Sequence, residues 1–167
     1  PIVRMDMDAL KKELADRLHG MTPDKVVFVG VGNRLRADDG IGPALVDLLK
    51  GRVAHAVDAD SAPENVTSAI RQLKPSAIVF LDAASFGDAA PGYARIVEPG
   101  DVEKLEATAH NFSLDVVMEY LKESTGADVF LVGVQPERIA EGESLSPSLI
   151  GPLKELSDDL VDAIKKD

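Results

Sequence analysis

The sequence contains no cysteine, and that absence excludes several kinds of function. A cysteine nucleophile, a thiolate zinc site and a disulfide framework are all ruled out. Long apolar runs are absent as well. None approaches the roughly 18 residues of a membrane span, and the first residues lack the apolar core of a signal peptide. We therefore expect a soluble protein of the cytoplasm.

Basic and aromatic residues are scarce. The chain has 18 Lys and Arg against 29 Asp and Glu, a formal net charge of −11. This disfavours nucleic acid as a partner, because phosphate binding needs a concentrated basic surface. With five Phe, two Tyr and no Trp, the core must be mainly aliphatic. The length of 167 residues fits one domain, residues 1–167. A domain of this size buries ~70% of the surface that its unfolded chain exposes.

Apolar patterns along the chain predict alternating strands and helices. Apolar runs predict strands at 25–29, 53–57, 77–81 and 129–134, and an alternating run predicts an edge strand at 93–97. Helical spacing predicts helices at 5–19, 40–50, 63–73, 100–106, 113–123 and 149–165. This alternation is typical of an α/β fold in which helices cover both faces of a mostly parallel sheet.

Ligands of such sheets bind beyond the carboxyl ends of the strands. The first strand is followed there by GVGNRLRADDGIG, residues 30–42. Its glycines suggest a dinucleotide-binding loop, but Leu35 stands where the third glycine of that motif would be. Asp38 and Asp39 would also repel a pyrophosphate at the helix N-terminus. The two carboxylates suit a cation better than an anion.

Two more candidates follow later in the chain. Asp82 comes directly after the apolar run 77–81, and a buried carboxylate must be hydrated, hydrogen-bonded or metal-bound. His110 lies in a predicted loop before a helix that Ser113 would cap, and alone it is typical of an exposed loop histidine. With Asp39, these residues form a plausible oxygen and nitrogen ligand set for nickel or zinc. The residues alone therefore indicate a metal-binding α/β domain, with hydrolysis as one candidate activity.

Several motifs in register resemble the nickel–iron hydrogenase maturation endopeptidases. After residues 30–42 come SAPEN at 61–65, FLDAA at 80–84, AHN at 109–111 and LVGVQP at 131–136. SAPEN and AHN look closest to the branch that processes hydrogenase-3-type large subunits. The likeness spans roughly residues 25–150. We therefore interpret residues 1–24 as an added N-terminal helical segment.

The resemblance implies a fold, an activity and a site. The fold would be a three-layer αβα sandwich around a twisted, mostly parallel five-stranded sheet. The activity would be removal of the C-terminal extension of a hydrogenase large-subunit precursor after nickel insertion. In that family the metal, thought to be the substrate's own nickel, is bound by residues that match Asp39, Asp82 and His110 here. The partner would be the nickel-loaded precursor, and we expect a monomer without nucleic acid or a membrane span.

The mechanism is less constrained. No Ser–His–Asp set and no Asp-Thr/Ser-Gly motif is evident, so we favour attack by a water molecule near the bound nickel. Asp38 is a hypothetical general base, although capping of the following helix is its favoured interpretation. Arg34 and Arg36 would contact acidic groups of the precursor or, as we favour, offset the charge of Asp38 and Asp39.

Rival interpretations of the whole chain stay open at this point. They are a non-catalytic nickel-binding chaperone or a metal-dependent hydrolase on the same scaffold, a small nucleotide-binding domain, and a protease with another substrate, such as a germination protease.

Overall fold

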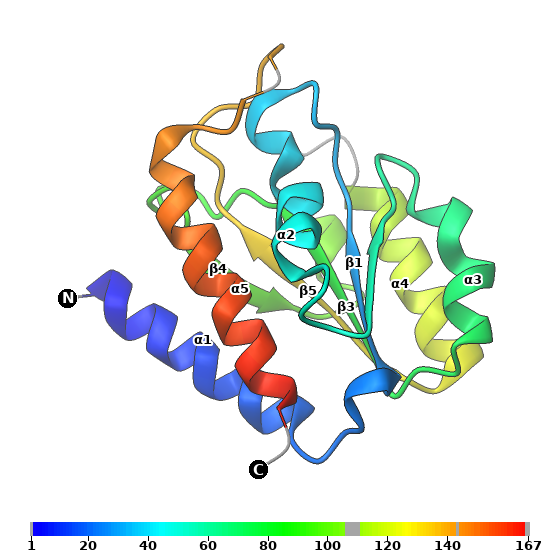
Figure 1. The fold of residues 1–167 in the computed structure, drawn as a ribbon. Coiled ribbons are helices and arrows are strands. Elements are labelled where there is room, and N and C mark those ends of the chain that lie inside the picture. Colours follow the sequence, from blue (N-terminus) through cyan, green and yellow to red (C-terminus); the bar gives the residue numbers. More distant parts are fainter. Residues whose placement is uncertain (1, 106–110, 143, 166–167) are drawn as a thin grey trace.

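A five-stranded sheet runs through the middle of the molecule in the order β2-β1-β3-β5-β4 (Figure 1). The structure, a computed structural model, describes residues 2–105, 111–142 and 144–165. The strands are β1 (Val26–Gly30), β2 (His55–Asp58), β3 (Ala77–Ala83), β4 (Ala94–Val97) and β5 (Asp128–Val134). β1 pairs in parallel with β2 and β3, and β3 pairs in parallel with β5. Only β4, at one edge, is antiparallel to its neighbour. The predicted mostly parallel sheet is confirmed.

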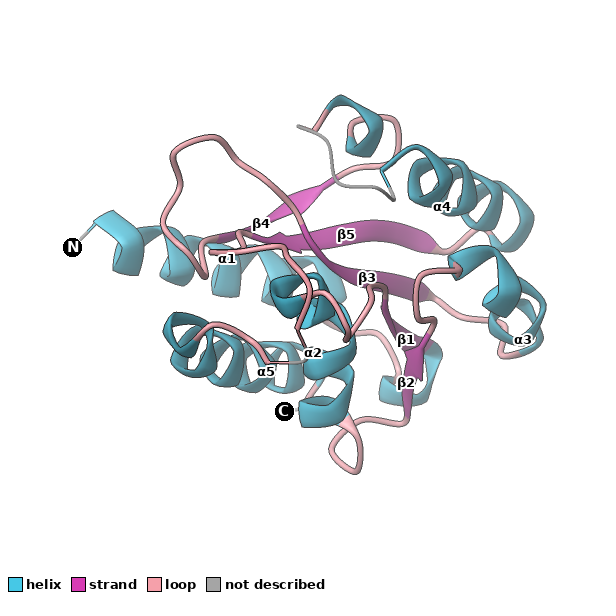
Figure 2. Cartoon of the chain, turned by 90° about the horizontal axis from the view of Figure 1, so that it is seen from above, coloured by secondary structure: helices cyan, strands magenta, loops and turns pink. Residues whose placement is uncertain are grey.

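Helices cover both faces of the sheet, as predicted for a three-layer sandwich (Figure 2). One layer contains α1 (Ile2–Leu18), α2 (Ile41–Leu49) and α5 (Ile150–Ile164), and the other contains α3 (Thr67–Gln72) and α4 (Asn111–Thr125). Within the described part of the chain, no helix combines the length and apolarity that a membrane crossing requires.

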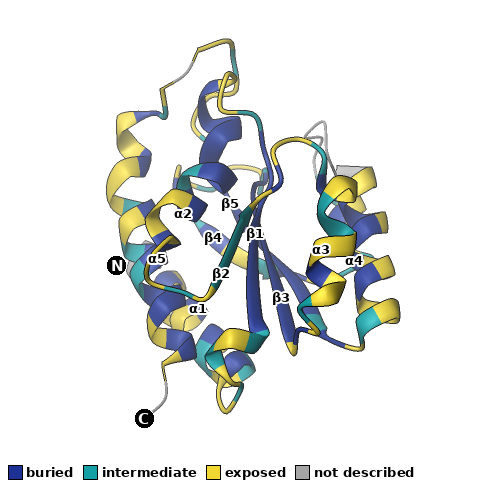
Figure 3. Ribbon diagram, turned by 45° about the vertical axis from the view of Figure 1, so that its right-hand side comes forward, coloured by how far each residue is buried: buried dark blue, intermediate teal, exposed yellow. Residues whose placement is uncertain are grey.

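Each layer packs through its own aliphatic cluster, so the molecule has one core on each side of the sheet. One cluster joins the helices of the α1 layer to residues such as Phe28 and Val79, and the other joins α4 to residues such as Val27 and Phe80. β1 and β3 are buried along their whole length (Figure 3). Burial on both faces explains why these strands are continuous apolar runs in the sequence.

Several predicted elements differ from the observed ones. The predicted helix 63–73 is divided into a short 3₁₀ helix, Pro63–Val66, and α3. The predicted helix 100–106 is reduced to a 3₁₀ turn, Val102–Lys104. α4 begins at Asn111, so Ser113 lies inside the helix and the prediction that it caps the N-terminus is wrong.

The N-terminal segment completes one helical layer. Met7, Leu10, Leu14 and Leu18 of α1 are buried, and the helix packs against α5 and β4. Near its end, Arg17 donates hydrogen bonds of 2.7 Å to Asp128. Its guanidinium also lies 4.2 Å from the centre of the Phe130 ring. Helix α1 therefore covers the edge where β4 and β5 pair.

Candidate metal-recognition site

Two glycines bring helix α2 directly onto the sheet. A Cβ atom added to Gly42 would lie 2.3 Å from the carbonyl oxygen of Val31 and 2.4 Å from that of Leu81. A Cβ atom on Gly30 would lie 2.5 Å from the carbonyl oxygen of Gly42. No side chain fits at such distances, so the first turn of α2 can touch the carboxyl ends of β1 and β3 only because these residues are glycine. Gly30 and Gly42 thus allow α2 to pack closely against β1 and β3.

A third glycine shapes the loop that carries Asp39. Gly32 has a φ of 146°, and a Cβ atom there would lie 1.9 Å from the backbone oxygen of Asp39. The next amide, of Asn33, donates a 3.0 Å hydrogen bond to Oδ2 of Asp39. Asp39 itself belongs to a short 3₁₀ helix, η2 (Ala37–Gly40), and only 4% of its surface is exposed. The loop therefore fixes a buried carboxylate just before α2.

Asp82 lies at the same edge of the sheet. The strand β3 extends two residues beyond the predicted apolar run, so Asp82 is inside the strand, opposite Gly133 of β5. It is 1% exposed. Its Oδ1 atom is buried and accepts no hydrogen bond from a described residue, although Asp82 has other interactions. Because η2 contacts β3, the structure brings the elements that carry Asp39 and Asp82 together.

The third predicted ligand cannot be placed. His110 lies outside the described residues, immediately before the start of α4 at Asn111. Among the residues that the structure describes, no group of three or more His, Asp and Glu side chains could hold a metal ion. The set of Asp39, Asp82 and His110 therefore stays a prediction.

The carboxylate of Asp38 has different hydrogen-bond partners from the carboxylate of Asp39. Its carboxylate is fully buried and accepts four hydrogen bonds, from the amides of Glu137, Arg138 and Ser146 and from the Ser146 hydroxyl. Burial alone would raise the pKa of the Asp38 carboxyl, but these hydrogen bonds together hold that pKa below its usual range. Helix α2 has no side-chain cap. The interpretation of Asp38 as its N-cap is wrong.

The interpretation of Arg34 as a counter-charge for Asp38 and Asp39 is also wrong. Its guanidinium forms ion pairs with Asp47 at 2.7 Å and with Asp58 at 3.0 Å. These partners lie on α2 and at the end of β2, so Arg34 ties the helix to the edge strand.

Sequence reasoning missed the role of Gln135, which follows β5. Its side-chain Oε1 accepts a 2.7 Å hydrogen bond from the amide of Phe86. Its backbone carbonyl accepts a hydrogen bond from the amide of Gly92, and its amide donates one to the carbonyl of Tyr93. Gln135 thus holds the loop between β3 and β4 beside the strand ends. The motif LVGVQP contains this residue, but its neighbours in the sequence do not indicate that it contacts a separate loop.

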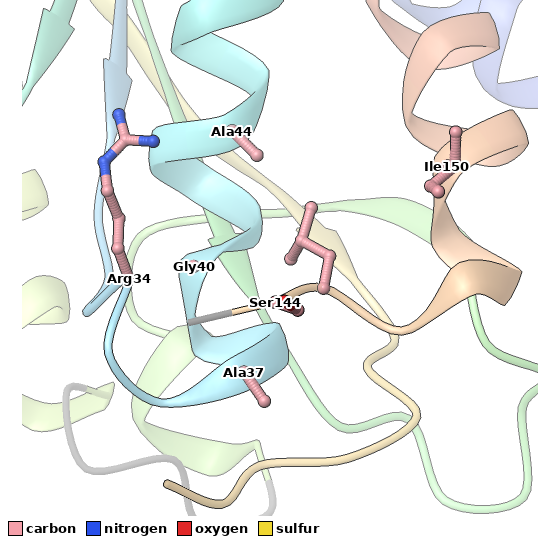
Figure 4. Close-up of a pocket in the computed structure, with 7 residues that line it drawn as sticks. Arg34, Ala37, Gly40, Ala44, Ser144 and Ile150 are labelled. Atoms are coloured by element: carbon pink, nitrogen blue, oxygen red, sulfur yellow. The ribbon is translucent and has the colours of Figure 1, made fainter. Parts of the chain in front are cut away.

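A pocket of about 390 Å³ opens beside η2 (Figure 4). The start of α2 and the chain before α5 form its walls. The lining residues are Arg34, Ala37, Gly40, Ala44, Ser144, Leu145 and Ile150. Gly40, which lines the pocket, directly follows Asp39 in the sequence.

Two solved structures with this fold are of a hydrogenase maturation protease and an endopeptidase. The nickel–iron hydrogenase maturation protease HycI of Thermococcus kodakarensis superimposes with a TM-score of 0.78 at 28% identity, covering 92% of this chain and 99% of that one. The solution structure of the endopeptidase HycI of Escherichia coli gives a TM-score of 0.71 at 29% identity, with 85% and 90% covered.

Sequence comparison identifies the family. The chain is 40% identical over 116 residues to the hydrogenase 3 maturation protease of Escherichia coli K12, covering 66% of this chain and 72% of that protein. It is 25% identical over 168 residues to a putative hydrogenase maturation protease of Methanocaldococcus jannaschii, covering 88% and 98%. No protein-family model matches the chain. The chain belongs to the hydrogenase maturation proteases, and it is an endopeptidase.

Proposed function

We propose that this protein removes the C-terminal extension of the large-subunit precursor of a nickel–iron hydrogenase, of the hydrogenase-3 type, once nickel has been inserted. The observation that carries the proposal is the pair of buried carboxylates, Asp39 and Asp82, on contacting elements at the carboxyl edge of the sheet. The likeness to a hydrogenase 3 maturation protease supports the choice of substrate. The protein would act in the cytoplasm as a monomer.

Nickel is part of the substrate in this proposal. Asp39, Asp82 and His110 would bind the precursor's own nickel, and their oxygen and nitrogen atoms suit a borderline divalent ion. A precursor without nickel would not bind to these three residues and would stay uncut. A water molecule close to the nickel would attack the peptide bond, since a nearby cation polarises the carbonyl and lowers the pKa of water.

The test is cleavage of purified precursor, with and without nickel, followed by mass spectrometry of the products. We expect a shortened large subunit only from the nickel-loaded precursor. Asp39→Ala, Asp82→Ala and His110→Ala should each abolish the shortening while circular dichroism shows a folded protein. A matched control is Asp16→Ala, which removes a carboxylate that is exposed on α1 and paired only with Lys12.

Two results would contradict the proposal. Equal cleavage of the nickel-free precursor would show that nickel is not the recognition signal. Normal cleavage by all three variants would show that Asp39, Asp82 and His110 are not the nickel ligands. Nickel-dependent binding of the precursor without any shortening would favour a chaperone instead of a protease.

A further inference from the structure

The carboxylate of Asp38 anchors a distant stretch of chain, which we call the anchored segment (residues 137–142 and 144–146). Oδ2 accepts hydrogen bonds from the amides of Glu137 at 3.0 Å and Arg138 at 2.7 Å and from the Ser146 hydroxyl at 2.7 Å. Oδ1 accepts a 2.7 Å bond from the Ser146 amide. An ionised carboxylate has about four lone-pair sites. Three of the four donors bond to Oδ2 and one bonds to Oδ1, and because the carboxylate is fully buried, a substrate water does not reach it.

Backbone pairing reinforces the anchor. The amide of Ala37 donates to the carbonyl of Gly142 at 2.7 Å, and the amide of Gly142 donates to the carbonyl of Leu35 at 3.0 Å. The amide of Asp38 itself donates to the carbonyl of Arg138 at 3.1 Å. The anchored segment therefore lies along η2 and its position depends on contacts with that turn.

The anchored segment also forms part of the pocket beside η2. Ala37 and Ala44 line it from one side, and Ile150 of α5 lines it from the other (Figure 4). Leu145 of the anchored segment also lines the pocket. These four side chains are apolar, and Ile150 is 65% exposed. A wall of this kind suits an extended polypeptide with apolar side chains. Such a chain would pass beside Gly40, the residue that follows Asp39 in the sequence.

We propose that Asp38 is a positioning residue, which holds the anchored segment as one wall of the pocket that receives the precursor's polypeptide chain beside its nickel. The identity of that chain rests on the proposed function. Asp38 acts on the reaction through the amides and the hydroxyl that it holds, and it exchanges no proton with the substrate.

Three variants separate these roles. Ser146→Ala removes one of the four hydrogen bonds but leaves the Asp38 carboxylate and its three amide donors intact. Asp38→Asn keeps the shape but places an amino group against hydrogen-bond donors. Ser157→Ala is the matched control, because Ser157 is also a buried serine and its hydroxyl donates to the backbone carbonyl of Lys154 within α5. Each variant is assayed for amide hydrogen exchange without substrate, and for kcat and KM with nickel-loaded precursor.

We expect Ser146→Ala to speed amide exchange in the anchored segment and to raise KM by about fivefold or more, with kcat within about twofold of wild type, since binding and not chemistry is lost. Asp38→Asn should show the same pattern more strongly, and Ser157→Ala should match wild type. If Asp38→Asn fails to fold, Ser146→Ala decides the question alone.

The proposal is overturned if Asp38→Asn lowers kcat by about a hundredfold while KM and amide exchange stay unchanged, which is the result expected for a general base. It is also overturned if exchange rises in the anchored segment but kcat and KM do not change, because the segment would then not touch the substrate. Failure of the wild-type protein to cut nickel-loaded precursor would refute the proposed function itself. That outcome is distinct because it appears before any substitution is made.

Discussion

Replacing Gly42 by alanine tests the packing on which the site depends. The new Cβ atom would lie 2.3 Å from the backbone oxygen of Val31, which directly follows β1, and 2.4 Å from that of Leu81 in β3. Ordinary contacts of this kind begin at 3.4 Å. The first turn of α2 must therefore recede by about 1 Å, since the Leu81 oxygen belongs to a strand and accepts a 2.9 Å hydrogen bond from the Val31 amide.

The expected cost follows from two opposing effects. Helix propensity favours alanine over glycine by about 0.5–1 kcal/mol, so local structure alone predicts stabilisation. Overpacking against rigid backbone costs about 1–3 kcal/mol, and a clash with two carbonyl oxygens belongs at the upper end of that range. The structure thus predicts a net loss of about 2 kcal/mol. In a protein of this size that lowers the unfolding temperature by about 4–8 °C.

The chain contains its own control for this experiment. Both α2 and α5 begin with the sequence Ile-Gly-Pro, and Gly42 and Gly151 are the second residues of these helices. Helix propensity and the effect of the following proline are therefore the same at both positions. A Cβ atom on Gly151 meets nothing within 4 Å. We expect Gly151→Ala to unfold at or slightly above the wild-type temperature and to cut precursor normally. Gly42→Ala should unfold earlier and cut more slowly, because Asp39 lies two residues before the displaced turn begins at Ile41.

The measurement is thermal unfolding by circular dichroism or calorimetry, with both variants in the same buffer. Equal unfolding temperatures for Gly42→Ala and Gly151→Ala would refute the reasoning, because the two substitutions differ only in their tertiary surroundings.

Two further predictions concern charged groups. Arg17→Met keeps an apolar stem on α1 but leaves Glu98 and Asp128 without their shared cation. It should lower the free energy of unfolding by about 1 kcal/mol, and the difference from wild type should shrink in high salt, as denaturant titrations would show. The second prediction follows from the lowered pKa of Asp38. A depressed carboxyl pKa contributes stability above the unfolded value of about 4 and loses it as the pH falls. Asp38→Asn should therefore be less stable than wild type at pH 6, and the difference should narrow as the pH falls below about 4, whereas a constant difference would contradict this origin.

Much of the fold follows from local patterns, for a physical reason. A strand buried on both faces is mainly apolar, so most of β1, β3 and β5 is visible as apolar runs, whereas Asp82 extends β3 beyond its run. β2 lies at an edge and is only half-buried, and its predicted range of 53–57 is correspondingly shifted from the observed His55–Asp58. The short 3₁₀ turns depend on how the chain enters and leaves the layers, and no repeating pattern marks them.

The site shows where local reasoning fails. In the sequence, Asp38 and Asp39 are two equal carboxylates before a helix, and the interpretations of cap, base and ligand all treat them by position alone. In a 3₁₀ helix, successive side chains point about 120° apart. Here one carboxylate meets Ser146, 108 residues further along, while its neighbour accepts a bond from the adjacent Asn33 loop. The hydrogen bonds that occupy Asp38 cannot be predicted from its neighbours in the chain. Because they hold it in a buried position, we propose Asp39, and not Asp38, as the ligand of the precursor's nickel.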